Sequence, residues 1–259
     1  MKDYNRNLLV VQAHPDDAEA WCGGTIKLLK DAGFKISIAT MTAGGMGGMN
    51  GNEQETIRLR KKEAAAAASI VGADYYCLDQ RDGYVFDNEE VRIKMVDLIR
   101  KVEAGVIITH IANDYHPDHR AASAICDAAA IISSLPNVPS EEKPLDVTPL
   151  LYHSAPMSLS DPLGFPIPAP HFFVDISTVI ETKLKMLGCH ESQMQLMKHM
   201  HKIDDFFGEM KKFSAELGHM VSVDYAECFW QHLGGGYQKD PLLQTVLQSN
   251  IRTPDVTGS

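Results

Sequence analysis

The sequence predicts an α/β domain with a mainly parallel sheet and helices on both of its faces. Short apolar runs, typical of strands that are buried on both sides, alternate along the chain with longer segments of helical periodicity. Two of these runs, residues 8–13 and 105–110, end in polar clusters that lead into a helix. Open α/β sheets place their functional sites at such strand ends.

The first strand–helix–strand unit follows from the N-terminal residues. We expect a strand at 8–13, a helix at 20–32 that Gly33 closes, and a second strand at 34–41. The crossover between the two strands should be right-handed. The next stretch, 43–51, is rich in glycine and methionine but lacks the Lys-Ser/Thr pair of a phosphate-binding loop. We interpret it as a mobile loop beside the site.

The middle of the chain continues the alternation. Residues 53–71 form the clearest predicted helix, because they carry a run of alanines and stop at Gly72. Four further elements follow: a strand at 75–78, a helix at 88–102, a strand at 105–110 and a helix at 121–133.

The C-terminal part predicts two more strands and a helical region. Residues 157–170 are rich in proline and should form an irregular surface loop. A helical insertion or oligomer contact is expected around 194–220, and a flexible tail after about 248. No boundary divides the chain, so we expect a single domain over 1–259. The remaining elements are strands at 150–154 and 172–176, a helix at 177–188 and a helical segment at 190–219.

Composition restricts the class of protein. Hydrophobic residues make up 44% and charged residues 22%, which is ordinary for a globular protein. The net charge of −10 and the lack of a basic stripe argue against a nucleic-acid partner. Five scattered cysteines without a C-x-x-C pair indicate free thiols in a reducing compartment. Without a signal pattern or a long apolar run, we expect a cytoplasmic protein with no membrane insertion.

The strongest internal signal is a repeated cluster. His-Pro-Asp-Asp at 14–17 and His-Pro-Asp-His at 116–119 each follow a predicted strand. Within each cluster two side chains are spaced i, i+3 and project the same way on a helical turn. Two imidazole nitrogens and one carboxylate suit Zn²⁺ with a fourth position open. The spacing leaves open which three of the four side chains bind: His14, Asp17, His116 and His119.

The same residues supply candidates for catalysis. Asp16 stands next to a ligand but points differently, which suits a base that takes a proton from water. If His119 is a ligand, His116 can stabilise an oxyanion or donate a proton. Either Asp118 or Asp114 can orient that imidazole and raise its pKa. The alternative for one cluster alone is a capped turn, with an aspartate binding helix amides.

At these residues the chain resembles the LmbE-like (PIG-L) family of zinc-dependent de-N-acetylases. The family motif A-H-P-D-D-E is similar to residues 13–19, where Ala18 is inserted before the glutamate, and the motif H-P-D-H is similar to 116–119. Three softer similarities follow: R-x-x-E at 60–63, H-x-S-Q at 190–193 and Y-A-E-A-F at 225–229. The inserted Ala18 and the glycine- and methionine-rich loop depart from the family pattern and leave the substrate open.

The resemblance implies a Rossmann-like three-layer fold and a zinc-dependent hydrolase. It implies Zn²⁺, or another divalent transition metal, on His14, Asp17 and His119, with Asp16 as general base and His116 as the oxyanion-stabilising or acid group. The implied reaction removes the N-acetyl group from an N-acetylglucosamine-type substrate.

The sequence also suggests residues that contact the substrate, binding partners and competing functions. Arg60 is a candidate contact for a sugar hydroxyl or an anionic group, the alternative being a salt bridge to Glu63 or a neighbouring helix. Asp114 is a second candidate substrate contact. We expect a small amino-sugar substrate and a homo-oligomer. The competing functions are an amidase for a different amide, such as a thiol conjugate, and a sugar-binding module that has lost catalysis.

Overall fold

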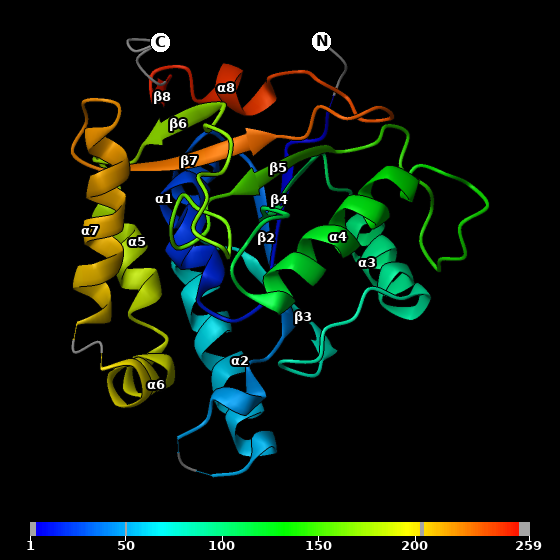
Figure 1. Ribbon diagram of the computed structural model, residues 1–259. Helices are drawn as coiled ribbons and strands as arrows, with labels where there is room; N and C mark the ends of the chain where they lie inside the picture. Colours follow the sequence, from blue (N-terminus) through cyan, green and yellow to red (C-terminus); the bar gives the residue numbers. More distant parts are fainter. Residues whose placement is uncertain (1–3, 50, 203–204, 254–259) are drawn as a thin grey trace.

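One eight-stranded sheet runs through the computed structural model, which describes residues 4–49, 51–202 and 205–253 (Figure 1). The strand order is β3-β2-β1-β4-β5-β7-β6-β8. Strands β1 to β5 pair in parallel, whereas β7, β6 and β8 form an antiparallel edge. The mainly parallel sheet expected from the sequence is confirmed. The strands are β1 (Asn7–Gln12), β2 (Lys35–Thr42), β3 (Asp74–Gln80), β4 (Val106–His110), β5 (Leu150–Ser154), β6 (Phe172–Asp175), β7 (Ala226–Gln231) and β8 (Ile251–Arg252).

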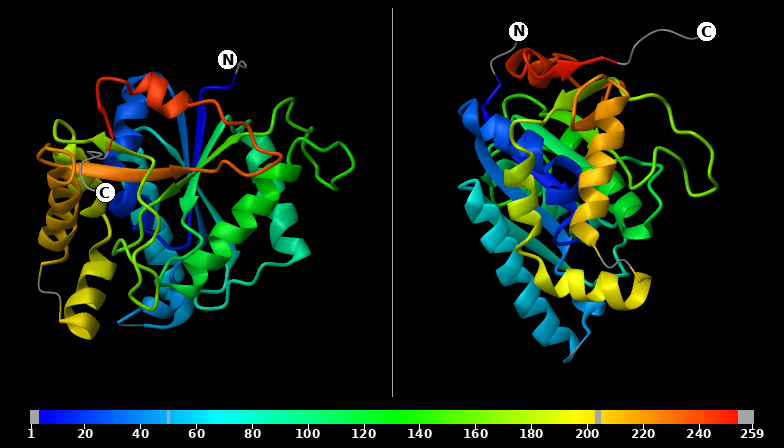
Figure 2. Two further views of the ribbon diagram at one scale, coloured as in Figure 1. Left: turned by 45° about the horizontal axis from the view of Figure 1, so that its top comes forward. Right: turned by 90° about the vertical axis from the view of Figure 1, so that its left-hand side faces the viewer.

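Helices cover both faces of the sheet. Helices α3 and α4 pack on one face, and α1, α2 and α5 cover the other, so the molecule has three layers (Figure 1). Helix α6 lies across the end of the α5–α7 pair (Figure 2). Within the described ranges, no helix is long and apolar enough to cross a membrane. The helices are α1 (Asp17–Asp31), α2 (Glu53–Ile70), α3 (Glu89–Lys101), α4 (Pro117–Ile132), α5 (Ile180–Leu187), α6 (Glu191–His201), α7 (Phe206–His219), α8 (Leu242–Val246) and the short 3₁₀ helix η1 (Gly45–Gly47).

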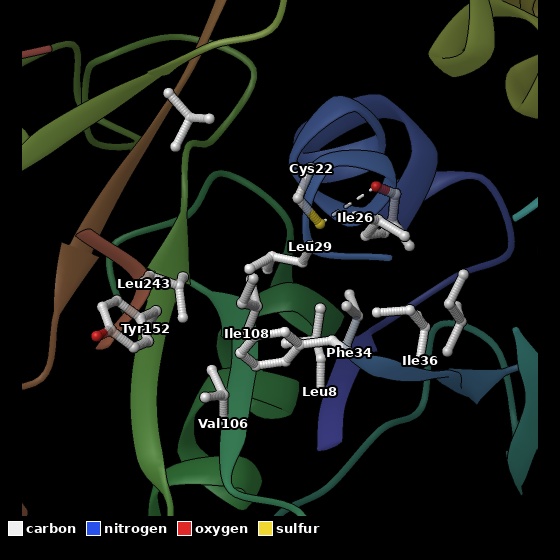
Figure 3. Packing of buried hydrophobic residues seen from close by; sticks show 14 of the residues in the cluster. Leu8, Cys22, Ile26, Leu29, Phe34, Ile36, Val106, Ile108, Tyr152 and Leu243 are labelled. Atoms are coloured by element: carbon white, nitrogen blue, oxygen red, sulfur yellow. Dashed lines mark hydrogen bonds between the residues drawn. The ribbon is translucent and has the colours of Figure 1, made fainter. Parts of the chain in front are cut away.

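The strands supply a separate core to each face. Successive side chains of a strand point to opposite faces. In β1, Leu8 and Val10 therefore pack with α1 in one cluster, while Leu9 and Val11 pack with α3 and α4 in the other. Figure 3 shows the first cluster, in which Cys22 of α1 lies over the strands. Both faces of the central strands are buried, which explains their nearly continuous apolar sequence.

Two expectations about the C-terminal part need correction. The helical segment at 190–219 is two helices, α6 and α7, because Lys202 adopts a left-handed conformation with φ 54° and ends α6. The tail expected to be flexible after 248 contains β8, which pairs with β6 and is held by Arg252, 2.9 Å from Asp175 Oδ2. Residues 254–259 of that tail lie outside the described residues. The proline-rich 157–170 loop is irregular, as expected, apart from one isolated bridge.

A buried ion pair supports a break in α1. The helix is interrupted at Cys22, which has the non-helical angles φ −146° and ψ 16°. Glu227 of β7 accepts the backbone N–H groups of Gly24 and Thr25 at 3.0 and 2.8 Å, so it caps the second half of the helix. Its carboxylate also accepts a 2.8 Å hydrogen bond from Lys183 Nζ. Both side chains of this pair are only 1% exposed.

Candidate metal centre

The two repeated clusters meet at the point where the strand order reverses. The chain leaves β1 toward β2 on one side, and β4 pairs with the other side of β1. The C-terminal ends of two such strands enclose a crevice, which is where doubly wound sheets bind ligands. His14 follows β1 by two residues, and His116 and His119 lie at the start of α4, which follows β4.

The turn between β1 and α1 is not an ordinary capped turn. Asp16 adopts a left-handed backbone conformation, φ 97°, and its side chain makes no capping hydrogen bond. Asp17 Oδ2 accepts the backbone N–H of His14 at 2.8 Å. Left-handed backbone at a residue other than glycine is strained and concentrates at functional sites. The alternative in which Asp16 satisfies helix amides is therefore wrong.

Asp17 lies between two imidazoles. Its Oδ2 atom is 3.3 Å from His14 Nδ1 and 3.4 Å from His119 Nε2. His14, His116 and His119 also place one ring nitrogen each within 4.8 Å of one another. The structure thus brings together all four of the side chains that the spacing proposed as ligands.

Neighbouring carboxylates determine which nitrogen of His119 carries a proton. His119 Nδ1 lies 2.9 Å from Asp114 Oδ1. An ionised carboxylate only accepts, so the proton belongs on Nδ1 and the Nε2 lone pair faces Asp17. Two acceptors 3.4 Å apart require a positive group between them.

Carboxylates also orient the ring of His14, but here they contact Nε2, and Nδ1 is the nitrogen that faces Asp17. His14 Nε2 is 3.3 Å from Asp118 Oδ2 and 3.3 Å from Asp82 Oδ1. The proton therefore belongs on Nε2, and the Nδ1 lone pair is directed at Asp17. Carboxylates that hold the outer nitrogen in this way are characteristic of metal-binding histidines.

The electrostatics of the site favour positive charge. Burial works to raise the pKa of Asp17, but His119, His110 and His14 outweigh it and hold that pKa well below its usual range. Burial works to lower the pKa of His119, yet Asp17 and Asp114 raise it to about 9. In the protein without metal, protons on the imidazoles balance the carboxylate.

His110 supports the centre and is not available as a ligand. Its ring stacks on that of His119, with centroids 3.8 Å apart and an interplanar angle of 10°. The backbone N–H of Ala13 donates to His110 Nε2 at 2.9 Å, so that lone pair is already used. Burial and the neighbouring His119 lower the pKa of His110 to about 4, so the ring is neutral.

His116 presents a proton to the same space. It is the N-cap of α4, and its Nδ1 atom accepts the backbone N–H of Asp118 at 3.2 Å. The proton of the neutral ring is therefore on Nε2. Burial, followed by the charges of His14 and His119, lowers its pKa, contrary to the expected increase. Asp118 does work to raise that pKa, as expected, but burial and the two neighbouring imidazoles outweigh it. The carboxylates of Asp114 and Asp118 themselves contact the rings of His119 and His14.

Asp16 and Arg60 form the other side of the site. Arg60 Nη2 lies 3.7 Å from Asp16 Oδ1, and the guanidinium donates to the backbone oxygens of Pro15 and Gly44. Burial raises the pKa of Asp16 to about 6, although Arg60 opposes the increase. Among the described residues Glu63 does not pair with Arg60, because it accepts the N–H and hydroxyl of Ser192. Of the alternatives for Arg60, the salt bridge to Glu63 is therefore not formed, whereas an ion pair with Asp16 at the start of the neighbouring helix α1 is.

We expect Gly44→Ala to destabilise the protein by about 3 kcal/mol, because it adds two costs. Gly44 has φ 64°, and a Cβ there would lie 2.0 Å from Arg60 Nη1. A left-handed conformation alone costs an alanine about 1–2 kcal/mol. Gly33→Ala is the control, since Gly33 has φ 88° with no atom within 4 Å of the added Cβ. Urea unfolding measures both variants, and equal losses would show that the Arg60 contact contributes nothing.

Several residues of the site escaped the sequence analysis. Asp82 was not among the predicted site residues, but it contacts His14 and accepts the N–H of Met46 at 3.0 Å, which ties the glycine- and methionine-rich loop to the centre. Its position just after β3, at the same edge of the sheet, was the available signal. Glu19 Oε2 lies 3.5 Å from His190 Nε2, and both side chains are buried. That pair joins α1 to the start of α6.

A cavity of about 490 Å³ opens onto the centre. Asp114 and Asp118 do not line it and are 0% and 2% exposed. The expected roles of Asp114 as a substrate contact and of Asp118 beside His116 therefore need correction, because the two carboxylates contact His119 and His14 of the candidate centre. The polar lining consists of His14, Asp16, Asp17, Arg60, Asp82, Tyr115, His116, His119 and Gln193.

Comparison with known proteins agrees with this site. Residues 9–130 match the family model PIG-L, described as GlcNAc-PI de-N-acetylase. The chain is 32% identical over 194 residues to diacetylchitobiose deacetylase of Thermococcus kodakarensis, covering 73% of this chain and 70% of that protein. It is also 32% identical to a probable N-acetyl-alpha-D-glucosaminyl L-malate deacetylase of Bacillus cereus, covering 74% of this chain and 86% of that protein. The chain belongs to the PIG-L family.

A solved structure extends the PIG-L similarity to the fold. The N,N'-diacetylchitobiose deacetylase of Pyrococcus horikoshii superposes with a TM-score of 0.75 at 25% identity, covering 91% of this chain and 87% of that chain. The resemblance first seen in short motifs is therefore confirmed across most of the PIG-L fold.

Proposed function

We propose that the protein is a metal-dependent hydrolase that removes the N-acetyl group from an N-acetylglucosamine-type substrate. The observation that carries the proposal is the convergence of His14 Nδ1, His119 Nε2 and Asp17 Oδ2 beside the buried carboxylate of Asp16. The two relatives that are 32% identical are named as deacetylases of such sugars, which supports the substrate class.

The donor set fits a divalent ion. Two imidazole nitrogens and one carboxylate oxygen converge in a buried space that favours positive charge, which is a donor set suited to a divalent cation in place of the imidazole protons. His14, Asp17 and His119 would hold the ion; Zn²⁺ suits this set best, and another divalent transition metal is compatible. The ion would supply Lewis acidity, which polarises a carbonyl and acidifies water.

Three side chains of the protein have separate roles in the proposed amide hydrolysis. Asp16 accepts a proton from the water that adds to the amide carbon, and it returns the proton to the nitrogen when the C–N bond breaks. His116 Nε2–H donates to the carbonyl oxygen as negative charge develops. Arg60 holds Asp16 in place and lines the cavity, where it can also contact the sugar.

The carboxylates around the centre maintain its geometry. Asp118 and Asp82 fix His14, and Asp114 fixes His119, so each ligand keeps its lone pair directed inward. Removal of such outer carboxylates typically weakens metal affinity or activity about 10–100-fold. The cytoplasmic location and the homo-oligomer expected from the sequence stay predictions.

The metal part of the proposal predicts that His119→Ala and His14→Ala lose their bound metal. The wild-type protein should contain about one equivalent of divalent ion per chain by elemental analysis. His199→Ala, which removes an exposed imidazole from α6, should retain it. Less than half an equivalent in the wild type, or full metal in His119→Ala, would contradict the assignment.

A substrate panel tests the reaction itself. Acetate release should occur from N-acetylglucosaminides and stop when a chelator removes the ion. Release from simple amides or thiol conjugates but not from the sugars would favour the amidase alternative. Sugar binding without any release would favour the inactive binding module.

A further inference from the structure

One part of the lining of the cavity is apolar and contains none of the candidate metal ligands. It is built from α1, α6, α7 and the loop after β5. Helices α6 and α7 close this side of the molecule, as Figure 2 shows. The wall, which we name the apolar wall, consists of Trp21, Met157, Leu196, Met197, Phe206 and Met210.

The apolar wall continues into a second hollow. A space of about 250 Å³ lies along α7 and shares Met157, Phe206 and Met210 with the main cavity. Phe213 extends the apolar surface of this hollow, and the charged side chains of Glu209, Lys212 and Glu216 also line it. The two spaces therefore have three side chains in common, and charged residues of α7 line the second space.

The chemistry of the apolar wall disfavours a purely polar occupant. Of its six side chains, Trp21 alone carries a nitrogen or oxygen. Among the described residues, its Nε1 atom has no hydrogen-bond partner, and neither has Oε1 of Gln193, which also lines the cavity from α6, so only these two side chains on this side offer a polar contact. Burying sugar hydroxyls against such a surface costs about 1–3 kcal/mol for each unpaired group. Burying an alkyl group against the same surface is instead favourable in free energy, and methionine side chains adapt to different apolar shapes.

We propose that the apolar wall binds an alkyl chain carried by the amino-sugar substrate. The inference rests on the proposed function for the location of the amide. The chain can be attached at the acyl group or at the glycosidic oxygen, and both attachments present the same chemistry to the apolar wall. Arg60 and the polar end of the cavity remain available to the sugar.

Two substrate series test the proposal and distinguish the attachments. In the acyl series, methyl glucosaminide carries N-acetyl, N-butanoyl or N-hexanoyl groups. In the glycoside series, N-acetylglucosamine carries methyl, butyl or hexyl groups. Each buried methylene is worth roughly fourfold in affinity, so kcat/KM should rise at least tenfold along one series. A flat or falling kcat/KM along both series would overturn the proposal.

Variants of the apolar wall locate the effect. Met157→Glu places a charge on a side chain that lines both spaces, and Met197→Gln makes the α6 side polar. Both substitutions should reduce at least fivefold the ratio of kcat/KM for the longest substrate of the responsive series to kcat/KM for the shortest. Met200→Gln is the matched control, because Met200 lies on the same helix, is 63% exposed and does not line the cavity. An unchanged ratio in Met157→Glu and Met197→Gln would contradict the location.

A binding measurement separates this proposal from the proposed function. The chain has two tryptophans, Trp21 in the apolar wall and Trp230, which donates to Pro168 O elsewhere. In the Trp230→Phe variant, titrations followed by Trp21 fluorescence should give a dissociation constant at least tenfold lower for hexyl glucoside than for methyl glucoside. Both glucosides are kept below the concentrations at which they form micelles. Tighter binding of hexyl glucoside without turnover of any substrate would reject the proposed deacetylase activity but not the alkyl-chain site. Equal binding of the two glucosides would reject the alkyl-chain site.

Discussion

Asp16→Asn should lower kcat about a thousandfold while the protein keeps its divalent ion. The buried carboxylate of Asp16, whose pKa is raised to about 6, is the acceptor for the proton of the attacking water in the proposed reaction. An amide has nearly the same shape but cannot take up that proton, and general-base catalysis contributes about 10²–10⁴-fold. The proposed metal ligands His14, His119 and Asp17 are untouched by the change.

Rate and metal content must be measured on the same preparation. Steady-state acetate release gives kcat, and elemental analysis gives the equivalents of metal per chain. Asp31→Asn is the matched control, since Asp31 is half-exposed at the end of α1 and pairs only with Lys27 nearby. A near-normal kcat in Asp16→Asn would remove Asp16 as the base, and a loss of metal would make it a ligand.

Glu227→Ala should reduce the free energy of unfolding by about 3–5 kcal/mol. The substitution leaves the charge of Lys183 buried without its partner and also uncaps the second half of α1. Breaking a buried ion pair by removing one member typically costs this much. Urea unfolding of the wild type and the variant measures the difference.

Two comparisons isolate the buried charge as the cause. Glu90→Ala removes a glutamate that pairs with Lys94 at 2.7 Å on the surface of α3, and such exposed pairs are worth about 0–1 kcal/mol. The double variant Glu227→Gln with Lys183→Met removes both charges, and its free energy of unfolding should fall less than that of Glu227→Ala. A Glu227→Ala loss no larger than that of Glu90→Ala would contradict the structural role of the pair.

Local patterns were enough to predict the layers and the position of the centre. Apolar runs mark strands that are buried on both faces, and the polar clusters after β1 and β4 meet because these strands are neighbours. The four candidate ligands, His14, Asp17, His116 and His119, come together as their spacing suggested.

The partners of the aspartates could not be predicted in the same way. Asp118 is close to His116 in sequence, but α4 directs its carboxylate across the sheet edge to His14. Asp82 and Glu227 reach their partners only through tertiary packing, between segments that are far apart in the chain. The pairing of β8 with β6 likewise depends on a strand nearly eighty residues earlier, so composition alone suggested a tail.

The alternation of side chains in β1 has an evolutionary consequence. Four of its residues, 8–11, fill two opposite cores, and the strand also places His14 in the lining of the cavity. Exchange of one apolar residue for another in β1 alters packing locally, whereas insertion or deletion of a single residue would turn every side chain to the wrong core. Among descendants of this sequence, changes in length should therefore accumulate in the loops at 134–149 and 157–170, while β1 changes only by substitution.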